Sequence, residues 1–418
     1  MIVKFPNLRF PGFEGKWEVN KLGGVSKKIN SGKTPLGGEA VYTDKGVTFI
    51  RSQNVNHNRL ELLNSVYISE KINNGMLNSI VKPNDILLNI TGASLGRSCV
   101  VPNDFEIGNV NQHVCIIRVN EEYNPRFIQP ILSSSKGQNI FLSLQTGSGR
   151  EGLNFESIKG IQISFPPLSE QDKIANFISL LGDRISTQKK IINNLESLMQ
   201  GFREKIFSQK LRFKDENGNY FPQWQKTKLG DIGTFQTSSI DKLLKSDEKE
   251  VYLVNYMNVY RHEIINSTTI KSFQIVTAKE NQINGCSLKK GDILFTPSSE
   301  TPKDIGHSVV ISENLENAVF SYHLMRFRPI IDIDILYSHY FCNISSILNQ
   351  LTKLATGSTR FTISLKSFSN IEINLPSLQE QTIIANFLSS IENKIDIEKK
   401  LLIKFEAQKK YLLNNLFI

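Results

Sequence analysis

LSEQDKIANFISLL at residues 168–181 and LQEQTIIANFLSSI at residues 378–391 are two copies of one stretch of sequence. Gln171 matches Gln381, and the run Ile-Ala-Asn-Phe begins three residues later in both copies, at a constant separation of 210 residues. A repeat at a fixed separation predicts that the fold itself is duplicated.

Each copy is predicted to begin a long helix whose apolar residues step alternately by four and by three. This 3.5-residue period is typical of a coiled-coil seam. The seam is polar at Gln188 and Glu398, which are equivalent, and again at Lys409, while Gly182 and Gly201 inside the first helix each cost about 1 kcal/mol relative to alanine. The expected seam consists of Ile174, Ile178, Leu181, Ile185, Ile192, Leu195, Ile384, Leu388, Ile391, Ile395, Leu402 and Phe405.

A helix of about 38 residues is about 57 Å long, which is too long to wrap inside one small domain. Two such helices in one chain can bury each other's seams, so we expect them to pack together as a rigid spacer. Two unrelated surface helices are the alternative, and the close match between the copies argues against it.

The repeat extends beyond the helices to the segments that precede them. Trp17 and Leu22-Gly23 match Trp224 and Leu229-Gly230 at a separation of 207 residues. Further equivalent pairs are Asp85 and Asp292, Gly96 and Gly306, and His113 and His323. The expected fold class is therefore α+β with an internal pseudo-two-fold repeat: a mixed α/β domain at 1–165, a helix at 166–210, a second domain at 211–374 and a second helix at 375–418.

Within the domains, short β-like runs alternate with turn residues. In the first domain the expected strands are 47–50, 85–90, 98–101, 114–119 and 161–165. Helices are expected at 125–134 and, in the second domain, at 334–349.

Composition places the chain among ordinary globular proteins. It has 418 residues, of which 39% are hydrophobic, a net charge of +9 and a pI near 9.1. The positive balance favours a polyanionic partner such as nucleic acid without proving one. Four cysteines without close spacing, and the lack of any long apolar run or signal-peptide core, lead us to expect a cytoplasmic protein with no membrane partner.

Motifs for catalysis or metal binding fail on inspection. Gly32-Lys33-Thr34 lacks the glycine five positions earlier that a phosphate-binding loop needs. Asn124-Pro125-Arg126-Phe127 resembles an adenine-holding motif of amino-methyltransferases, but the second proline is missing, and Asn-Pro is typical of a helix start. No histidine pair has a metal-ligand spacing, and no nucleophile elbow is present. The sequence therefore favours a binding protein with no catalytic residue and no metal.

Loops rich in Arg, Asn and Gln are the natural candidates for reading DNA, because these side chains pair with base edges. An ordinary polar surface loop is the competing interpretation for each of them. The candidates in the first domain are Lys33, Thr34, Arg51, Gln53, Asn54, Thr91, Arg97, Asn111, Gln112, His113, Ser148 and Arg150. Those in the second domain are Asn255, Tyr256, Asn258, Thr296, Ser298, Ser299, Lys303, Tyr322, His323, Ser358, Thr359 and Arg360.

The chain as a whole resembles the specificity subunits of type I restriction-modification systems. The resemblance rests on the domain–helix–domain–helix repeat, the joints LSEQDKIANF and LQEQTIIANF, the LRF…W…KLG segments, and the Asp-Ile-Leu strands followed by Gly96 and Gly306. It implies that each variable domain is a target recognition domain that reads one half of a split, asymmetric site in double-stranded DNA. It also implies that the two helices lie antiparallel as a coiled coil and fix the gap between the half-sites.

The resemblance also implies the partners. Two modification subunits would dock on the chain and methylate adenine N6, and two restriction subunits would add ATP-driven translocation and cleavage. S-adenosylmethionine, ATP and Mg would be used by these partners, so no cofactor is expected on this chain. Two other interpretations remain open: a methyltransferase with degenerate cofactor motifs, and a coiled-coil scaffold that binds only proteins.

Overall fold

The computed structural model describes residues 5–56, 58–145 and 152–418, and it divides into two compact units. Unit 1 comprises Met1–Lys190 and Lys399–Ile418, and unit 2 comprises Ile191–Glu398. Two long helices, α5 (Leu168–Phe207) and α12 (Leu378–Asn415), each contribute one half to either unit. The expected α+β architecture with two long helices is confirmed.

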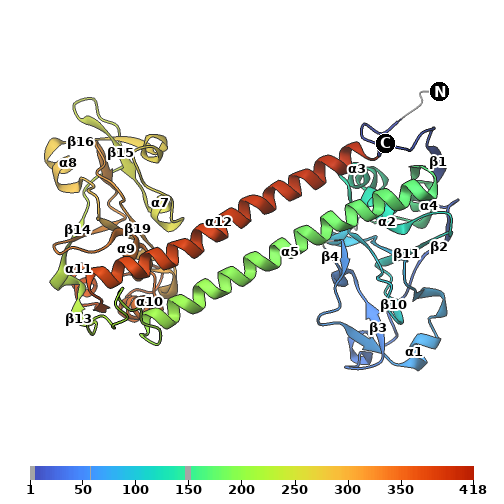
Figure 1. Ribbon diagram of the computed structural model, residues 1–418, viewed down its shortest axis with the longest axis horizontal. Coiled ribbons are helices and arrows are strands. Elements are labelled where there is room, and N and C mark those ends of the chain that lie inside the picture. Colours follow the sequence, from blue (N-terminus) through green and yellow to red (C-terminus); the bar gives the residue numbers. More distant parts are fainter. Residues whose placement is uncertain (1–4, 57, 146–151) are drawn as a thin grey trace. The chain divides into compact units, whose positions relative to one another are not determined.

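Unit 1 contains two four-stranded sheets, with strand orders β2-β11-β8-β9 and β6-β3-β10-β7. In the second sheet β10 runs parallel to β3, whereas β11 is antiparallel to both of its neighbours. Helices α2, α3 and α4 lie beside the first half of α5 (Figure 1). The strands are β1 Glu18–Lys21, β2 Ser26–Ser31, β3 Val47–Ile50, β4 Val55–Asn56, β5 Arg59–Leu60, β6 Val66–Ile68, β7 Ile80–Val81, β8 Ile86–Asn89, β9 Ser98–Val100, β10 Gly108–Val110, β11 Val114–Val119 and β12 Gln162–Phe165. The helices are α1 Glu70–Asn74, α2 Pro125–Ser133, α3 Ser135–Leu144 and α4 Phe155–Gly160, with 3-10 turns η1 Gly38–Val41, η2 Ser52–Asn54, η3 Leu77–Ser79 and η4 Gly92–Ser94.

Unit 2 repeats this plan with the strand orders β14-β21-β17-β19 and β16-β15-β20. Here β15 and β20 are the parallel pair, equivalent to β3 and β10. The strands are β13 Gln225–Lys228, β14 Gly233–Thr237, β15 Lys249–Val254, β16 Gln274–Ala278, β17 Ile293–Phe295, β18 Ser298–Ser299, β19 Ser308–Val310, β20 Ala318–Phe320, β21 Met325–Pro329, β22 Phe361–Thr362 and β23 Glu372–Leu375. The helices are α6 Leu229–Ile232, α7 Tyr256–Tyr260, α8 Glu280–Cys286, α9 Ile335–Phe341, α10 Ser345–Leu354 and α11 Leu365–Ser369, with η5 Thr269–Ser272 and η6 Pro302–Asp304.

The halves of α5 and α12 pack antiparallel within each unit. In unit 1, Ile178 near the start of α5 shares a core with Leu416 just beyond the end of α12, and Lys189 further along α5 pairs with Glu406 at 2.8 Å. In unit 2, the rings of Phe202 and Phe387 meet edge to face at 5.1 Å between centroids. All twelve expected seam residues are buried or half-buried, from 0% exposure at Ile384 and Leu388 to partial exposure at Leu181, Ile185, Leu195, Ile391, Leu402 and Phe405.

The repeated Glu-Gln of the two joints is explained by what these side chains hold. Glu170 is fully buried and accepts a bidentate pair from Arg9 at 2.7 and 2.8 Å. Gln171 donates to the carbonyl of Pro166 and accepts from the amide of Asn124, so one side chain ties the linker to the start of α2. In unit 2, Glu380 with Arg212 and Gln381 with Pro376 and Asp334 make the same contacts. The match between the copies therefore preserves a joint and not only a helix.

Other repeated positions also have structural roles. Gly96 and Gly306 both have a positive φ, of 84° and 88°, and a Cβ on Gly306 would lie 2.3 Å from Leu351. Asp85 and Asp292 each bind an arginine on the neighbouring strand, Arg118 and Arg328, at 2.7 and 2.6 Å. These residues stabilise the scaffold that both units share.

The helix expected at 125–134 is confirmed as α2, whereas the one expected at 334–349 is wrong as a single helix. That segment contains α9 and the start of α10, because the backbone is extended at Ile344 before α10 begins. In unit 1 the backbone is likewise extended at Ser134, before α3, a helix that was not predicted. At Ser134 the side chain caps α3 by accepting from the amide of Gly137 at 3.1 Å, and Gly137 packs so closely on α2 that a Cβ there would lie 2.3 Å from a carbonyl oxygen of α2. The break brings α3 back against α2, a tertiary arrangement that local periodicity does not reveal.

Candidate nucleic-acid interface

In unit 1, three loops meet around an open cavity of about 580 Å³. The loops follow β3, β8 and β10. Because β3 and β10 are parallel neighbours, the loops at their carboxyl ends emerge at one edge of the sheet. The loop after β8 lies beside the loop after β10, because the latter leads into β11, and Val114 at the start of β11 pairs with Asn89 at the end of β8. The cavity is lined by Arg51, Ser52, Gln53, Thr91, Gly92, Ala93, Ser94, Arg97, Asn111 and His113.

A chain of polar contacts orders one wall of this cavity. Thr34 donates to the side-chain oxygen of Gln112, whose amide nitrogen lies 3.1 Å from Nε2 of His113. Because an amide nitrogen only donates, Nε2 of His113 accepts this hydrogen bond. The ring hydrogen is then on Nδ1, which donates to Oγ1 of Thr91 at 2.6 Å. Thr34, Gln112, His113 and Thr91, all predicted from sequence, are thus one connected group.

Arginine and amide side chains supply the rest of the cavity. Arg51 is half-buried, lies over the ring of Tyr42 and has a buried Nε without a hydrogen-bond partner in the described part of the chain. Arg97 and Gln53 are exposed, and Arg97 donates to Asn56 at 3.3 Å. Guanidinium groups and side-chain amides that still have donors or acceptors to offer are the groups that read base edges in the major groove. The cavity therefore has the chemistry for direct readout.

Two amide side chains of this set are committed to the backbone. Asn54 is buried, caps the turn at Arg51 and donates to the carbonyl of Glu61. The Asn111 side-chain oxygen accepts from the amide of His113, which leaves its amide nitrogen as the group available to a ligand. Lys33 is exposed in the segment after β2, while Ser148 and Arg150 fall outside the described residues.

In unit 2, the equivalent region gathers a different set of side chains. Arg360 donates to the hydroxyl of Ser298 through Nε and Nη2, at 3.3 and 3.0 Å. The hydroxyl of Tyr256 donates to the carbonyl of Ser298 at 3.2 Å. Burial lowers the pKa of His323, and the positive charges of Lys242 and Arg360 lower it further. Tyr256, Ser298, Arg360 and His323 therefore form the candidate surface of unit 2.

The remaining candidates in unit 2 divide into exposed and internal groups. Tyr322 is 50% exposed, and Lys303, Ser358 and Thr359 are also exposed. Ser299 is buried and bonds to Thr301. The Asn258 side chain accepts from the amide of Asn255 at the start of α7, as Asn54 accepts from the amide of Arg51 at η2 in unit 1. The Asn255 side chain accepts from the amide of Tyr256, and Thr296 is fully buried. Contact with DNA by any of these candidates stays a prediction.

A histidine pair in unit 2 was missed from the sequence. Nε2 of His262 lies 3.1 Å from Nδ1 of His307, whose Nε2 lies 2.9 Å from the Asp304 carboxylate. Tyr260 also donates to Asp304, at 3.2 Å. These residues brace the loop that carries Lys303. The only sequence signal was the clustering of Asp304 and His307 in a predicted loop.

The motifs rejected for catalysis have structural roles. Asn124 caps α2 by accepting from the amide of Arg126 at 2.7 Å, with Pro125 at the first helical position, as expected.

In the described residues, no cluster of three or more His, Cys, Asp or Glu side chains is suited to a metal. Nor does any described helix have both the length and the apolar character to cross a bilayer.

The sequence is similar to those of known proteins over most of its length. The family model for the type I restriction modification DNA specificity domain matches residues 14–197 and 222–407. The MjaVIII type I restriction enzyme specificity subunit of Methanocaldococcus jannaschii is 26% identical over 95% of this chain and 91% of its own length. The EcoKI specificity subunit of Escherichia coli K12 is 20% identical over 85% of this chain and 78% of its own.

Solved structures agree on the fold. The S subunit of a type I restriction-modification system from M. genitalium superposes with a TM-score of 0.58 at 16% identity and covers 99% of both chains. A chain from a structure on complex assembly and conformational transition of the type I system gives 0.57 at 17% identity, covering 98% of this chain and 97% of its own. With two copies of the family domain spanning most of its length, the chain belongs to the type I restriction-modification DNA specificity family.

Proposed function

We propose that this chain is the DNA specificity subunit of a type I restriction-modification complex. Unit 1 reads one half of a bipartite site in double-stranded DNA, and unit 2 reads the other half. The chain supplies recognition and performs no chemistry, so the methyl donor S-adenosylmethionine, and ATP with Mg, are used by partner subunits.

One observation supports this proposal most strongly. The same loops of a repeated scaffold carry different side chains in the two units, with Arg51, Gln53 and Arg97 around the unit 1 cavity and Asn255, Tyr256 and Ser298 in unit 2, although the histidine is shared. Shared joints with divergent loops suit two readers that recognise different sequences.

The partners follow from the family. Two modification subunits would bind the chain and methylate adenine N6, and two restriction subunits would join them. The long helices would set the gap between the half-sites, because α5 and α12 enter both units without interruption.

A domain exchange tests the two-reader proposal. Residues 20–165 are replaced by the corresponding domain of another family member, and methylated adenines are mapped with the modification subunit present. We expect one half-site to change while the other half-site and the gap stay as they were. A change in both half-sites would show that the units do not read independently.

A further inference from the structure

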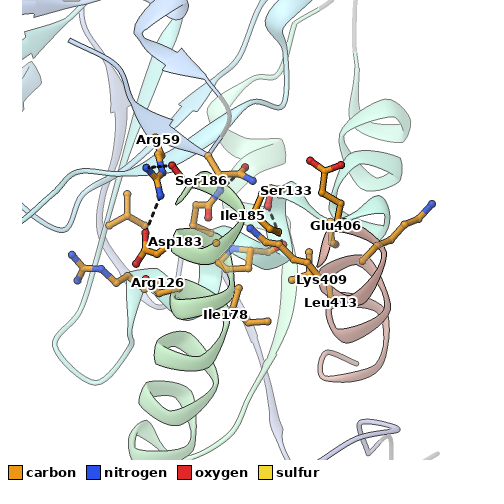
Figure 2. A pocket seen from close by; sticks show the side chains of 18 of the residues that line it. Arg59, Arg126, Ser133, Ile178, Asp183, Ile185, Ser186, Glu406, Lys409 and Leu413 are labelled. Atoms are coloured by element: carbon orange, nitrogen blue, oxygen red, sulfur yellow. Dashed lines mark hydrogen bonds and ion pairs between the residues drawn. The ribbon is translucent and has the colours of Figure 1, made fainter. Parts of the chain in front are cut away.

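A second cavity in unit 1, of about 820 Å³, lies apart from the residues of the reading loops. Its walls come from the β5 strand, from α2 and the start of α3, and from the halves of α5 and α12 that belong to this unit. Figure 2 shows Arg59 and Arg126 on one side and Lys409 reaching from α12 toward α5. No aromatic side chain is among the lining residues, which argues against a site for a base or another planar ring.

The lining carries more cations than carboxylates. Five basic side chains, Arg59, Arg126, Lys189, Lys409 and Lys410, face three acidic ones, Glu61, Asp183 and Glu406. Two of the carboxylates are already paired, Asp183 with Arg59 at 2.8 Å and Glu406 with Lys189 at 2.8 Å. The partners of Arg126 are the neutral amides of Asn84 and Asn103. Among the described residues, Arg126, Lys409 and Lys410 have no ion pair with a carboxylate of the lining, which keeps two more basic than acidic side chains.

Lys409 is the least favourably placed of these cations. It is half-buried on the seam of α12, where an apolar residue was expected, and Asp183, the carboxylate that acts on it, is paired with Arg59. Burial lowers the pKa of the Lys409 amine, and the charges of Arg59 and Lys189 lower it further. A half-buried ammonium group without a close counterion is costly, and a bound anion would remove that cost.

The repeat places different side chains at this position in the two units. Gly182, which faces Lys409 Nζ, is equivalent to Glu392 at the 210-residue separation. In unit 2 the Glu392 carboxylate accepts from the hydroxyl of Tyr340 at 2.6 Å and lies 3.8 Å from His339. Unit 1 has no side chain at that place, so a space lined by basic groups remains where unit 2 has a satisfied carboxylate.

We propose that this cavity of unit 1 binds a phosphate group, held by Lys409, Lys410 and Arg126 with the hydroxyls of Ser133 and Ser135 at its wall. The first turn of the ten-residue α3 begins at Ser135 and adds the partial positive charge of a helix N-terminus. The phosphate comes either from a free anion or from a DNA backbone. The inference does not depend on the proposed function, because the free anion can be tested on this chain alone.

The test measures binding of inorganic pyrophosphate to the purified full chain by calorimetry. We expect one site per chain, retained in Gly182→Ala and weakened at least tenfold in both Gly182→Glu and Lys409→Gln. The Gly182 pair is matched: both variants fill the same position, and only glutamate adds the charge that unit 2 carries. Lys404→Gln, at an exposed lysine of the same helix, is expected to bind as the wild type does.

Two results would overturn the proposal: no pyrophosphate binding by the wild type, or equal binding by Lys409→Gln and Lys404→Gln, which would indicate scattered surface lysines. Thermal melts establish that each variant is folded. A second measurement identifies the source, using the chain assembled with its modification subunit. If the phosphate belongs to DNA, Lys409→Gln lowers the salt dependence of DNA affinity by about one ion; if it is free, that dependence is unchanged.

Discussion

At the scale of single residues, the two buried glutamates of the joints differ in one contact. Glu380 accepts from Arg212 and also from Nε1 of Trp224 at 2.9 Å, whereas the equivalent Trp17 Nε1 is buried without a partner in the described residues. Removing the Glu380 charge therefore leaves two donors unsatisfied, and removing that of Glu170 leaves only Arg9.

We expect Glu380→Gln to lower the free energy of unfolding by about 2–4 kcal/mol, because a buried charge pair is broken on one side. Glu170→Gln is expected to cost less, and Glu372→Gln, whose pair with Lys226 is exposed, less than about 1 kcal/mol. Urea unfolding measures all three. An equal cost for Glu380 and Glu372 would contradict the role given to the joint.

The histidine pair of unit 2 predicts a dependence on pH. Burial is the main cause that lowers the pKa of His262 from its ordinary 6.5, and the charges of His307 and His339 add to it, while the Ser308 carbonyl acts in the opposite direction. The folded state therefore binds this proton less readily than the unfolded chain does. The stabilisation that neutral His262 gives the fold is complete above about pH 6.5. It is lost as the pH falls toward the lowered pKa of His262 in the folded state.

Unfolding measured between pH 8 and pH 5 checks this. We expect the wild type to lose more stability over that range than His262→Gln, which cannot take up the proton. Tyr260 and Asp304 also face the pair, so Asp304→Asn serves as a control that keeps His262 titratable. Identical pH profiles for the wild type and His262→Gln would count against the assignment.

The site residues show how far sequence reasoning reaches at this scale. Residue type and loop position were enough to predict Arg51, Gln53, Thr91, Arg97, Asn111 and His113, which line one cavity. They could not show that Asn54 and Asn258 are used as caps, because Asn has the same polar character whether it binds a ligand or its own backbone. The pairing of His262 with His307 depends on two loops meeting in space, and neither loop encodes it alone.

At the scale of elements, the long helices were predictable because their period is long and regular. The observed bounds of 168–207 and 378–415 lie within the expected segments. The strands at 47–50 and 114–119 were also predicted at their observed bounds. Short strands such as β4 and β5, helix α3 and the break after α9 depend on tertiary contacts and gave no periodic signal.

Within unit 2, the seam predicts which apolar residues hold α12 in place. Leu388 is fully buried among Ile384, Phe341 and their neighbours, whereas Ile397 on the same helix is 58% exposed. We expect Leu388→Ala to cost about 3 kcal/mol of unfolding free energy and Ile397→Ala less than about 1 kcal/mol. Thermal unfolding distinguishes them, and comparable costs would mean that the seam does not stabilise this unit.

At the scale of the whole molecule, the proposed spacer makes a prediction about distance along DNA. Inserting four residues near Gln188, with a matching insertion near Glu398, adds about one helical turn, or about 6 Å, to each helix. We expect the gap between the half-sites to grow by about one to two base pairs while both half-site sequences stay the same. Altered half-sites with an unaltered gap would mean that the helices do not set the spacing.

The account as a whole predicts two different readers that act at a fixed separation. Single-molecule sequencing of methylated adenines in DNA modified by the wild-type chain with its modification subunit tests this most directly. We expect one motif made of two unlike half-sites separated by a gap of constant length and variable sequence. A continuous motif, two identical halves, or a gap whose length varies would contradict it.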